Sequence, residues 1–213
     1  MKISSLQYIT QEHDKYSHSD LCKMACDAGL KWVQLRMKNV SDKEFLKEAN
    51  VCREITSNYN STLIINDNIK VAIDSQADGV HLGLTDLSTK EARNILGNNK
   101  IIGGTANTFE DILMHSKNGV NYVGVGPYRF TKTKDKLSPI LGIDGYQKII
   151  AELKKRDIEI PVIAIGGILF EDIKLLKEVG LNGIAVSGLL TNNFDKTIIN
   201  NIKNTFSTNY ANA

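Results

Sequence analysis

The sequence repeats one pattern eight times: a short apolar, β-rich run is followed by a longer stretch with helical periodicity. This alternation favours βα units and a parallel sheet, because a helix normally supplies the crossover between parallel strands. The predicted strands span residues 6–10, 32–37, 62–66, 79–82, 100–105, 122–126, 161–166 and 183–187. Eight units predict a (β/α)8 TIM barrel, with residues 1–213 as a single domain. An open doubly wound sheet is the alternative, although eight units exceed what that fold usually needs.

Several of the intervening stretches begin and end as helices do. Ser41 and Glu44 have the spacing of a capping box at the start of residues 41–55, and Thr108 and Asp111 repeat that spacing. Similar helical stretches are predicted for residues 17–29, 88–97, 108–119 and 170–180. Each of these four ends in glycine, which is a common helix stop.

Composition narrows the class of protein. Hydrophobic residues make up 42% of the 213 residues, which is enough to form a full buried core. The formal net charge of +2, without a basic stripe along any helix, argues against a nucleic-acid partner. No apolar run reaches the roughly 20 residues that cross a bilayer, and the first ten residues lack a secretory pattern. We therefore expect a cytoplasmic protein without a membrane partner.

The three cysteines are Cys22, Cys26 and Cys52. The first two lie one helical turn apart, but a structural zinc site usually needs four ligands, and the sequence offers no histidine or cysteine pair nearby to complete it. Free cysteine is often buried, so we expect all three to behave as small core residues.

The second predicted strand places Gln34, Arg36 and Lys38 on one face, opposite Val33, Leu35 and Met37. A barrel strand buries both faces, and an isolated buried charge is very costly. Arg36 therefore needs an anionic partner, for which a bound anion is the favoured interpretation and a structural carboxylate the alternative.

The third and fourth predicted strands deliver two carboxylates, Asp67 and Asp86, to their carboxyl ends. Oxygen ligands of this kind suit Mg²⁺, with water and ligand phosphate filling the remaining positions. Alternatively, Asp86 caps the helix that follows. His81 lies inside the fourth strand, where a hydrogen-bonded core histidine is the favoured interpretation.

Small residues end the later strands. Gly103, Gly104 and Thr105 close the fifth strand, where glycine would let a ligand approach the backbone. The seventh and eighth strands end in IAIGGI and IAVSG, a pattern typical of a phosphate site that includes Ser187. Because both loops carry the same pattern, phosphate binding is the favoured interpretation, and glycine in tight turns is the alternative.

The loop after the sixth strand, within GVGPYRFTKTKDKLSPILG, gathers cations and hydroxyls. They are Arg129, Thr131, Lys132, Thr133, Lys134 and Lys136. Such a loop, set between the acidic strand ends and the predicted phosphate site, can bridge two anions. A solvated charged loop without a ligand is the alternative.

Six motifs in one order carry a resemblance: QLRMK, IINDN, HLGLTD, GVGPYRFTKTK, AIGGI and VSG. Together they make residues 8–190 resemble the thiamine phosphate synthase family. The resemblance implies a transferase of thiamine biosynthesis, which joins 4-amino-2-methyl-5-pyrimidinylmethyl diphosphate to thiazole phosphate with Mg²⁺ and releases pyrophosphate. The implied partners are these two small molecules. A homodimer is compatible with the sequence.

The resemblance also implies a role for individual residues. The pyrimidine diphosphate would be bound by Gln34, Leu35, Arg36, Met37, Lys38, Asn66, Thr105 and Lys134, the thiazole phosphate by Thr131, Lys132, Thr133, Gly167, Val186 and Ser187, and Mg²⁺ by Asp67 and Asp86. The chemistry, a dissociative departure of diphosphate, needs positive charge rather than a strong base, so we assign Arg36, Lys38 and Lys134 as catalytic.

The sequence departs from the family pattern at three positions. Many members have glutamine at Leu84, often serine at Thr105 and histidine at Asn107. A thiazole tautomerase relative would share the barrel, but the histidine that resembles its base falls at Asn107. A non-catalytic protein that binds phosphorylated thiazole is the other alternative, and it would have no need of the acidic pair.

Overall fold

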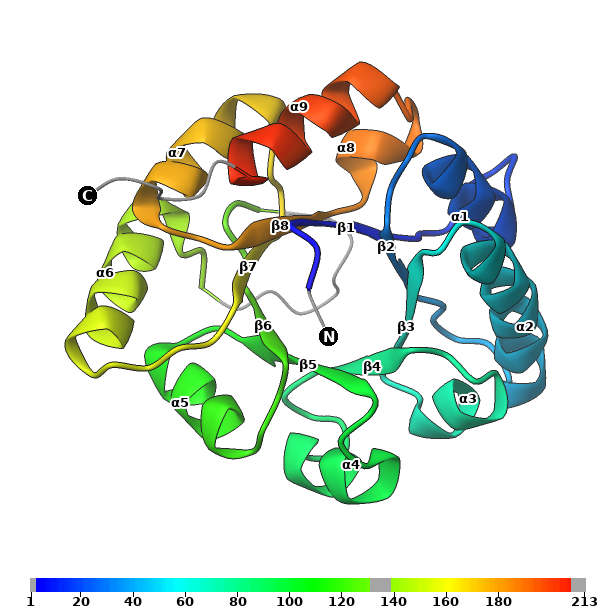
Figure 1. Ribbon diagram of the computed structural model, residues 1–213, viewed down its shortest axis with the longest axis horizontal. Helices are drawn as coiled ribbons and strands as arrows, with labels where there is room; N and C mark the ends of the chain where they lie inside the picture. Colours follow the sequence, from blue (N-terminus) through cyan, green and yellow to red (C-terminus); the bar gives the residue numbers. More distant parts are fainter. Residues whose placement is uncertain (1–2, 131–138, 208–213) are drawn as a thin grey trace.

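The computed structural model, which describes residues 3–130 and 139–207, is a closed barrel of parallel strands (Figure 1). The strands are β1 (Leu6–Ile9), β2 (Trp32–Leu35), β3 (Thr62–Asn66), β4 (Gly79–Leu82), β5 (Ile101–Ala106), β6 (Tyr122–Val125), β7 (Val162–Ile165) and β8 (Gly183–Val186). Each strand pairs with its neighbour in sequence, and β8 pairs with β1 to close the ring. The predicted TIM barrel is confirmed, and the closure excludes the open sheet.

A ring of helices surrounds the barrel in Figure 1. The described helices are α1 (His18–Asp27), α2 (Asp42–Asn58), α3 (Ile69–Asp74), α4 (Thr89–Leu96), α5 (Phe109–Lys117), α6 (Gly142–Lys155), α7 (Ile173–Val179), α8 (Gly188–Thr191) and α9 (Lys196–Ser207), and a 3-10 turn, Phe170–Asp172, precedes α7. The last unit thus carries two helices, the first very short. Within the described residues, we find no helix with both the length and the apolar character that crossing a membrane requires.

The predicted helix caps are present in the structure. The Ser41 hydroxyl accepts the Glu44 N–H while the Glu44 side chain returns to the Ser41 N–H, and Thr108 and Asp111 do the same. The N-cap of α4 is Ser88, whose hydroxyl accepts the Glu91 N–H. Asp86 therefore does not cap α4, and its carboxylate is available for another role.

The strands bury both faces, as a barrel requires. Their outer side chains join the helices in one large core, while a smaller cluster fills the interior: Ile9, Trp32, Ile64, Ile101, Tyr122, Ile163 and Ala185. Buried polar side chains accompany this interior cluster, namely Gln7, Gln34, Asn66 and His81. The three cysteines are free and buried in the outer core, as predicted.

Candidate active site

The strand register places the predicted site residues on adjacent strands at one end of the barrel. Because all strands are parallel, their carboxyl ends meet at a single rim, where barrels of this kind carry their active sites. Asn66 of β3 pairs with His81 of β4, and Thr105 of β5 pairs with Gly124 of β6. Asp67 follows β3 directly. The structure thus brings the predicted pyrimidine and metal residues of β3, β4 and β5 to one part of the rim.

Two carboxylates and one ammonium group meet there. Asp67 has a left-handed backbone, with φ at 62°, and its N–H donates to the His81 carbonyl at 2.8 Å. Its carboxylate forms an ion pair with Lys38. Asp86 accepts the Gly83 N–H at 2.6 Å. Burial and then the neighbouring Asp67 carboxyl group raise the pKa of Asp86, so the two carboxyl groups are close enough to interact.

This acidic pair fits a magnesium ion. Mg²⁺ is usually held in proteins by one or two carboxylates, with waters and substrate phosphates completing an octahedral shell. Asp67 and Asp86 supply two such carboxylates, and their mutual repulsion is what a divalent cation would relieve. The described residues contain no group of three or more acidic, histidine or cysteine side chains placed to hold a metal. The donor set therefore suits a hydrated Mg²⁺ rather than a fully protein-coordinated ion.

The prediction for Arg36 needs a correction. β2 ends at Leu35 rather than Met37, so Arg36 lies beyond the strand and is half-buried at the rim, not inside the barrel. Its backbone N–H donates to the Thr10 hydroxyl at 3.1 Å. Strand pairing with β3 stops at Leu35, which frees the following residues to leave the sheet. Arg36 therefore lies at the rim without the full desolvation of a barrel interior.

The other β2 residues of the predicted pyrimidine site differ in which of their groups can contact a ligand. Gln34 is only 1% exposed and points into the barrel, where its amide donates to the Asn66 side chain at 3.4 Å. Leu35 and Met37 pack in or against the outer core. The side chains of Leu35 and Met37 therefore face away from the mouth, so only the backbone of these two residues can contact a ligand.

Packing inside and outside the barrel accounts for the glycines of β5, for which the sequence predicted the approach of a ligand. A Cβ atom at Gly103 would lie 2.2 Å from the Tyr122 ring, and one at Gly104 would lie 2.6 Å from the His115 ring. Packing of those rings inside and outside the barrel excludes any side chain. Thr105, by contrast, is half-buried at the mouth, and its hydroxyl contacts His81 Nε2 at 3.0 Å.

The loops after β7 and β8 hold the residues predicted for a phosphate. Gly166 and Gly167 have φ values of 94° and 66°, and added Cβ atoms would press on Pro127 and on the backbone of Phe130. Turn conformation and packing thus account for both glycines. Ser187 stands directly before α8, and its hydroxyl donates to Gln11 at 2.7 Å. The Val186 side chain is buried in the outer core, so only its backbone faces the rim.

Arg129, one of the cations noted in the loop after the sixth predicted strand, is paired within the protein. Its guanidinium donates to both carboxylate oxygens of Asp172 at 2.7 and 2.9 Å and to the Gly167 carbonyl at 2.9 Å. Burial alone would raise the pKa of Asp172, but Arg129 and the Leu169 N–H lower it below its usual value. Sequence reasoning missed Asp172, because its position near the start of a predicted helix indicates only an acidic first turn. Five predicted loop residues lie outside the described residues: Thr131, Lys132, Thr133, Lys134 and Lys136.

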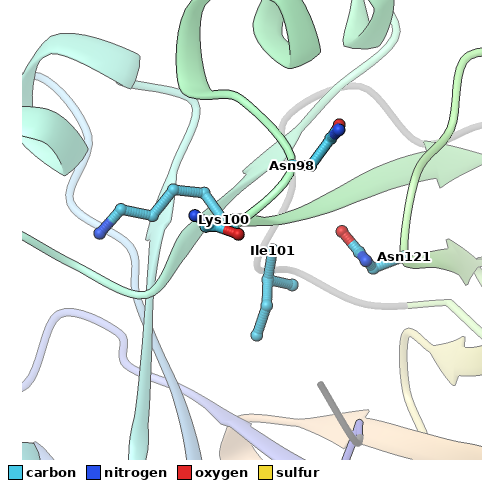
Figure 2. A pocket seen from close by; sticks show the side chains of 5 residues that line it. Asn98, Lys100, Ile101 and Asn121 are labelled. Atoms are coloured by element: carbon cyan, nitrogen blue, oxygen red, sulfur yellow. The ribbon is translucent and has the colours of Figure 1, made fainter.

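A pocket of about 320 Å³ lies away from this rim (Figure 2). It is lined by Asn98, Asn99, Lys100, Ile101 and Asn121, residues that precede or begin β5 and β6. These positions lie at the amino ends of the strands, the opposite end of the barrel. The pocket therefore takes no part in the candidate active site.

A closed (β/α)8 barrel with an acidic pair and basic groups gathered at its carboxyl rim is a TIM-barrel protein with the layout of an enzyme. The family model for thiamine monophosphate synthase matches residues 6–190. The thiamine-phosphate synthase of Flavobacterium johnsoniae is 50% identical over 196 residues, 92% of each chain, and that of Phocaeicola vulgatus is 47% identical, covering 89% of this chain and 91% of the relative. A solved thiamine phosphate pyrophosphorylase from Pyrococcus furiosus superposes with a TM-score of 0.78 at 27% identity, over 93% of this chain and 96% of that one. The chain belongs to the thiamine monophosphate synthase family.

Proposed function

We propose that this chain makes thiamine phosphate from 4-amino-2-methyl-5-pyrimidinylmethyl diphosphate and thiazole phosphate, with release of pyrophosphate. Membership of the family and near-complete coverage of relatives with this name support the activity, which is that of a transferase. The observation that carries it is the meeting of Lys38, Asp67 and Asp86 at the rim beside Thr105. A site for a metal-bound diphosphate requires such a grouping.

The reaction breaks the bond between the methylene carbon of the pyrimidine and a diphosphate oxygen, and the bonding electrons leave with the diphosphate. The electron-rich aminopyrimidine stabilises the resulting cation, and the lone pair of the thiazole nitrogen then forms the new carbon–nitrogen bond. No proton has to be removed by a side chain in these steps. The site must stabilise the departing anion and hold two substrates in line.

Basic side chains supply the stabilisation of the leaving group. Arg36 and Lys38 follow β2, and Lys38 contacts Asp67 of the acidic pair. Lys134 joins them by resemblance to the family. At an effective dielectric of 20, one charge pair at 4 Å is worth about 4 kcal/mol, so a few such contacts are comparable with the barrier reduction that enzymes provide. Desolvation opposes each term, which makes their sum an upper bound.

Asp67 and Asp86 would hold Mg²⁺, which when bound supplies further positive charge next to the diphosphate. The Lys38 ammonium already contacts Asp67, so it balances part of the acidic charge and stays beside the place where the diphosphate would bind. The Thr105 hydroxyl lies at the barrel mouth, and the buried amides of Gln34 and Asn66 lie deeper in the barrel, where they would contact the pyrimidine substrate by resemblance to the family.

The thiazole phosphate would lie across the mouth, against the loops after β7 and β8. Backbone groups of Gly167 and Val186 and the Ser187 hydroxyl support this placement, together with residues 131–133 by resemblance. A cytoplasmic location belongs to the same proposal, and three buried free cysteines fit a reducing compartment.

The tautomerase alternative is disfavoured at Asn107. Its side-chain amide donates to the Gly126 carbonyl, and an amide nitrogen cannot act as a base. Purified protein mixed with both substrates and Mg²⁺ tests the proposal. Thiamine phosphate formed with equal pyrophosphate supports the synthase, isomerised thiazole phosphate supports the tautomerase, and binding without turnover supports a carrier.

A further inference from the structure

Four side chains form a continuous hydrogen-bonded chain through the interior of the barrel, from β1 to the mouth. Gln7 Nε2 donates to the Tyr122 hydroxyl at 3.3 Å, and that hydroxyl lies 3.0 Å from His81 Nδ1. His81 Nε2 lies 3.0 Å from the Thr105 hydroxyl. Gln7, Tyr122 and His81 are buried, whereas Thr105 is half-buried at the rim. We call these four residues the interior chain.

One direction of donation satisfies every hydrogen bond of the interior chain. An amide nitrogen only donates, so the Tyr122 oxygen accepts from Gln7, and in this direction its single proton goes to His81 Nδ1, the acceptor within reach. Burial raises the pKa of Tyr122, which keeps that proton in place. A neutral imidazole that accepts at Nδ1 carries its hydrogen on Nε2 and donates it to Thr105. The Thr105 hydroxyl oxygen then accepts this hydrogen bond from His81, and the Thr105 hydroxyl hydrogen remains to donate toward the mouth.

The packing around the interior chain holds the two rings in this arrangement. Trp32 meets the Tyr122 ring edge to face at 4.8 Å, and the Tyr122 and His81 rings lie 5.5 Å apart. A Cβ atom at Gly103 would lie 2.2 Å from Tyr122, and one at Gly124 would lie 3.0 Å from His81. Two glycines on neighbouring strands thus leave room for the rings. An imidazole enclosed in this way cannot flip without disturbing the barrel core.

We infer that His81 is a positioning residue, which acts through Thr105 by holding its hydroxyl as a hydrogen-bond donor to an anionic phosphate oxygen of the pyrimidine substrate. The inference rests on the proposed function, because that function places the diphosphate next to Thr105. A hydroxyl free to rotate would present a lone pair to the anion part of the time. A hydroxyl held as a donor is prepared for the charge that grows on the leaving group, where preorganised donors contribute most.

The tautomer of His81 can be measured without turnover. Ring ¹⁵N chemical shifts of histidine-labelled protein distinguish the two neutral tautomers and the imidazolium, and His81→Gln assigns the signal among the four histidines. We expect hydrogen on Nε2 in the parent and a mixture of tautomers in Tyr122→Phe, which lacks the donor to Nδ1. Hydrogen on Nδ1 in the parent, or an imidazolium near neutral pH, would overturn the inference.

A matched pair of amides tests the effect on catalysis. In His81→Gln the amide nitrogen reaches the position of Nε2 and still donates to Thr105, whereas the shorter side chain of His81→Asn does not. We expect kcat to stay near the parent value in the first variant and to fall about tenfold in the second, the usual size for a hydrogen bond to a charged group. With Thr105→Val in both, the two variants should be indistinguishable.

The outcomes separate the inference from the proposed function. Equal losses in the glutamine and asparagine variants, or a difference that persists in the Thr105→Val background, would show that His81 does not act through Thr105. A parent without synthase activity would remove the proposed function, while the tautomer measurement would still decide the hydrogen-bond direction. If His81→Asn fails to fold, the ring ¹⁵N shifts of the labelled parent and of Tyr122→Phe still test the inference.

Discussion

Arg129 and Asp172 form a two-pronged ion pair that joins the loop after β6 to the turn before α7. The guanidinium also donates to the Gly167 carbonyl and lies 5.0 Å from the centre of the Tyr128 ring. The Tyr128 hydroxyl donates to the same carboxylate at 3.3 Å. The pair therefore ties the two loops that flank the proposed thiazole phosphate site, and its loss has consequences for stability.

Arg129→Ala is expected to destabilise the protein. It would leave the Asp172 side chain, only 7% exposed, as an uncompensated charge. Breaking a buried pair costs about 3–5 kcal/mol, but Arg129 is 42% exposed, so we expect about 1–3 kcal/mol in urea unfolding. Lys155→Ala, which removes an exposed pair with Glu152, is the control and should change stability by at most about 0.5 kcal/mol. Equal losses in the two variants would contradict the structural role of Arg129.

The same pair predicts a pH dependence with a definite sign. The pKa of Asp172 is lowered in the folded protein, so the carboxylate contributes stability above its unfolded pKa and loses it as pH falls through the folded value. The stability difference between the parent and Arg129→Ala should therefore be full near neutral pH and shrink below about pH 4. Urea midpoints measured from pH 7 down to 3 check this, and a constant difference would be the contrary result.

The sequence was sufficient to predict the barrel and the first residue of most strands, because eight apolar runs separated by capped helices leave few alternatives. The rim location of Asp67, Asp86 and Thr105 followed from parallel strands alone. Strand ends were less accurate, since β2 stops at Leu35 once its pairing with β3 ends. Alternation of side chains could not reveal that Arg36 leaves the sheet.

Contacts between loops could not be predicted, since they depend on how distant segments meet. Arg129 and Asp172 are 43 residues apart, and nothing in either local sequence points to the other. The hydrogen bonds of the interior chain could not be predicted for the same reason, because Gln7, Tyr122 and His81 come from three different strands. Glycine in β5 was attributed to a ligand because a sequence does not show which ring occupies the space beside it.

Asp67→Asn should weaken the dependence of turnover on Mg²⁺. The substitution removes one of two adjacent carboxylates and leaves a weaker oxygen ligand, so a higher Mg²⁺ concentration is needed for half-maximal rate. We expect a shift of at least about tenfold, the usual scale for losing a ligand interaction. Asp74→Asn on α3, an exposed acid paired with Lys70, is the control. Coincident Mg²⁺ titrations for the Asp67 variant and the parent would remove it from the metal site.

Lys134→Ala tests a residue that lies outside the described part of the chain and is assigned by resemblance. Loss of one cation beside the departing diphosphate should lower kcat by at least about tenfold, equivalent to about 1.4 kcal/mol, and leave unfolding unchanged. Lys174→Ala, an exposed lysine on α7, is the matched control for a lost surface charge. Turnover equal to the parent in the Lys134 variant would exclude the loop after β6 from the mechanism.

Gly103→Ala distinguishes packing from ligand approach as the reason for glycine in β5. The added methyl group would lie 2.2 Å from the Tyr122 ring, which is buried and enclosed by Trp32, so the barrel core has to shift. Such overpacking costs about 1–3 kcal/mol, and we expect a lower urea midpoint even without ligand. Gly188→Ala is the control, since nothing lies within 4 Å of the added atom. If ligand approach were the reason, Gly103→Ala would match the parent in stability and lose only substrate affinity.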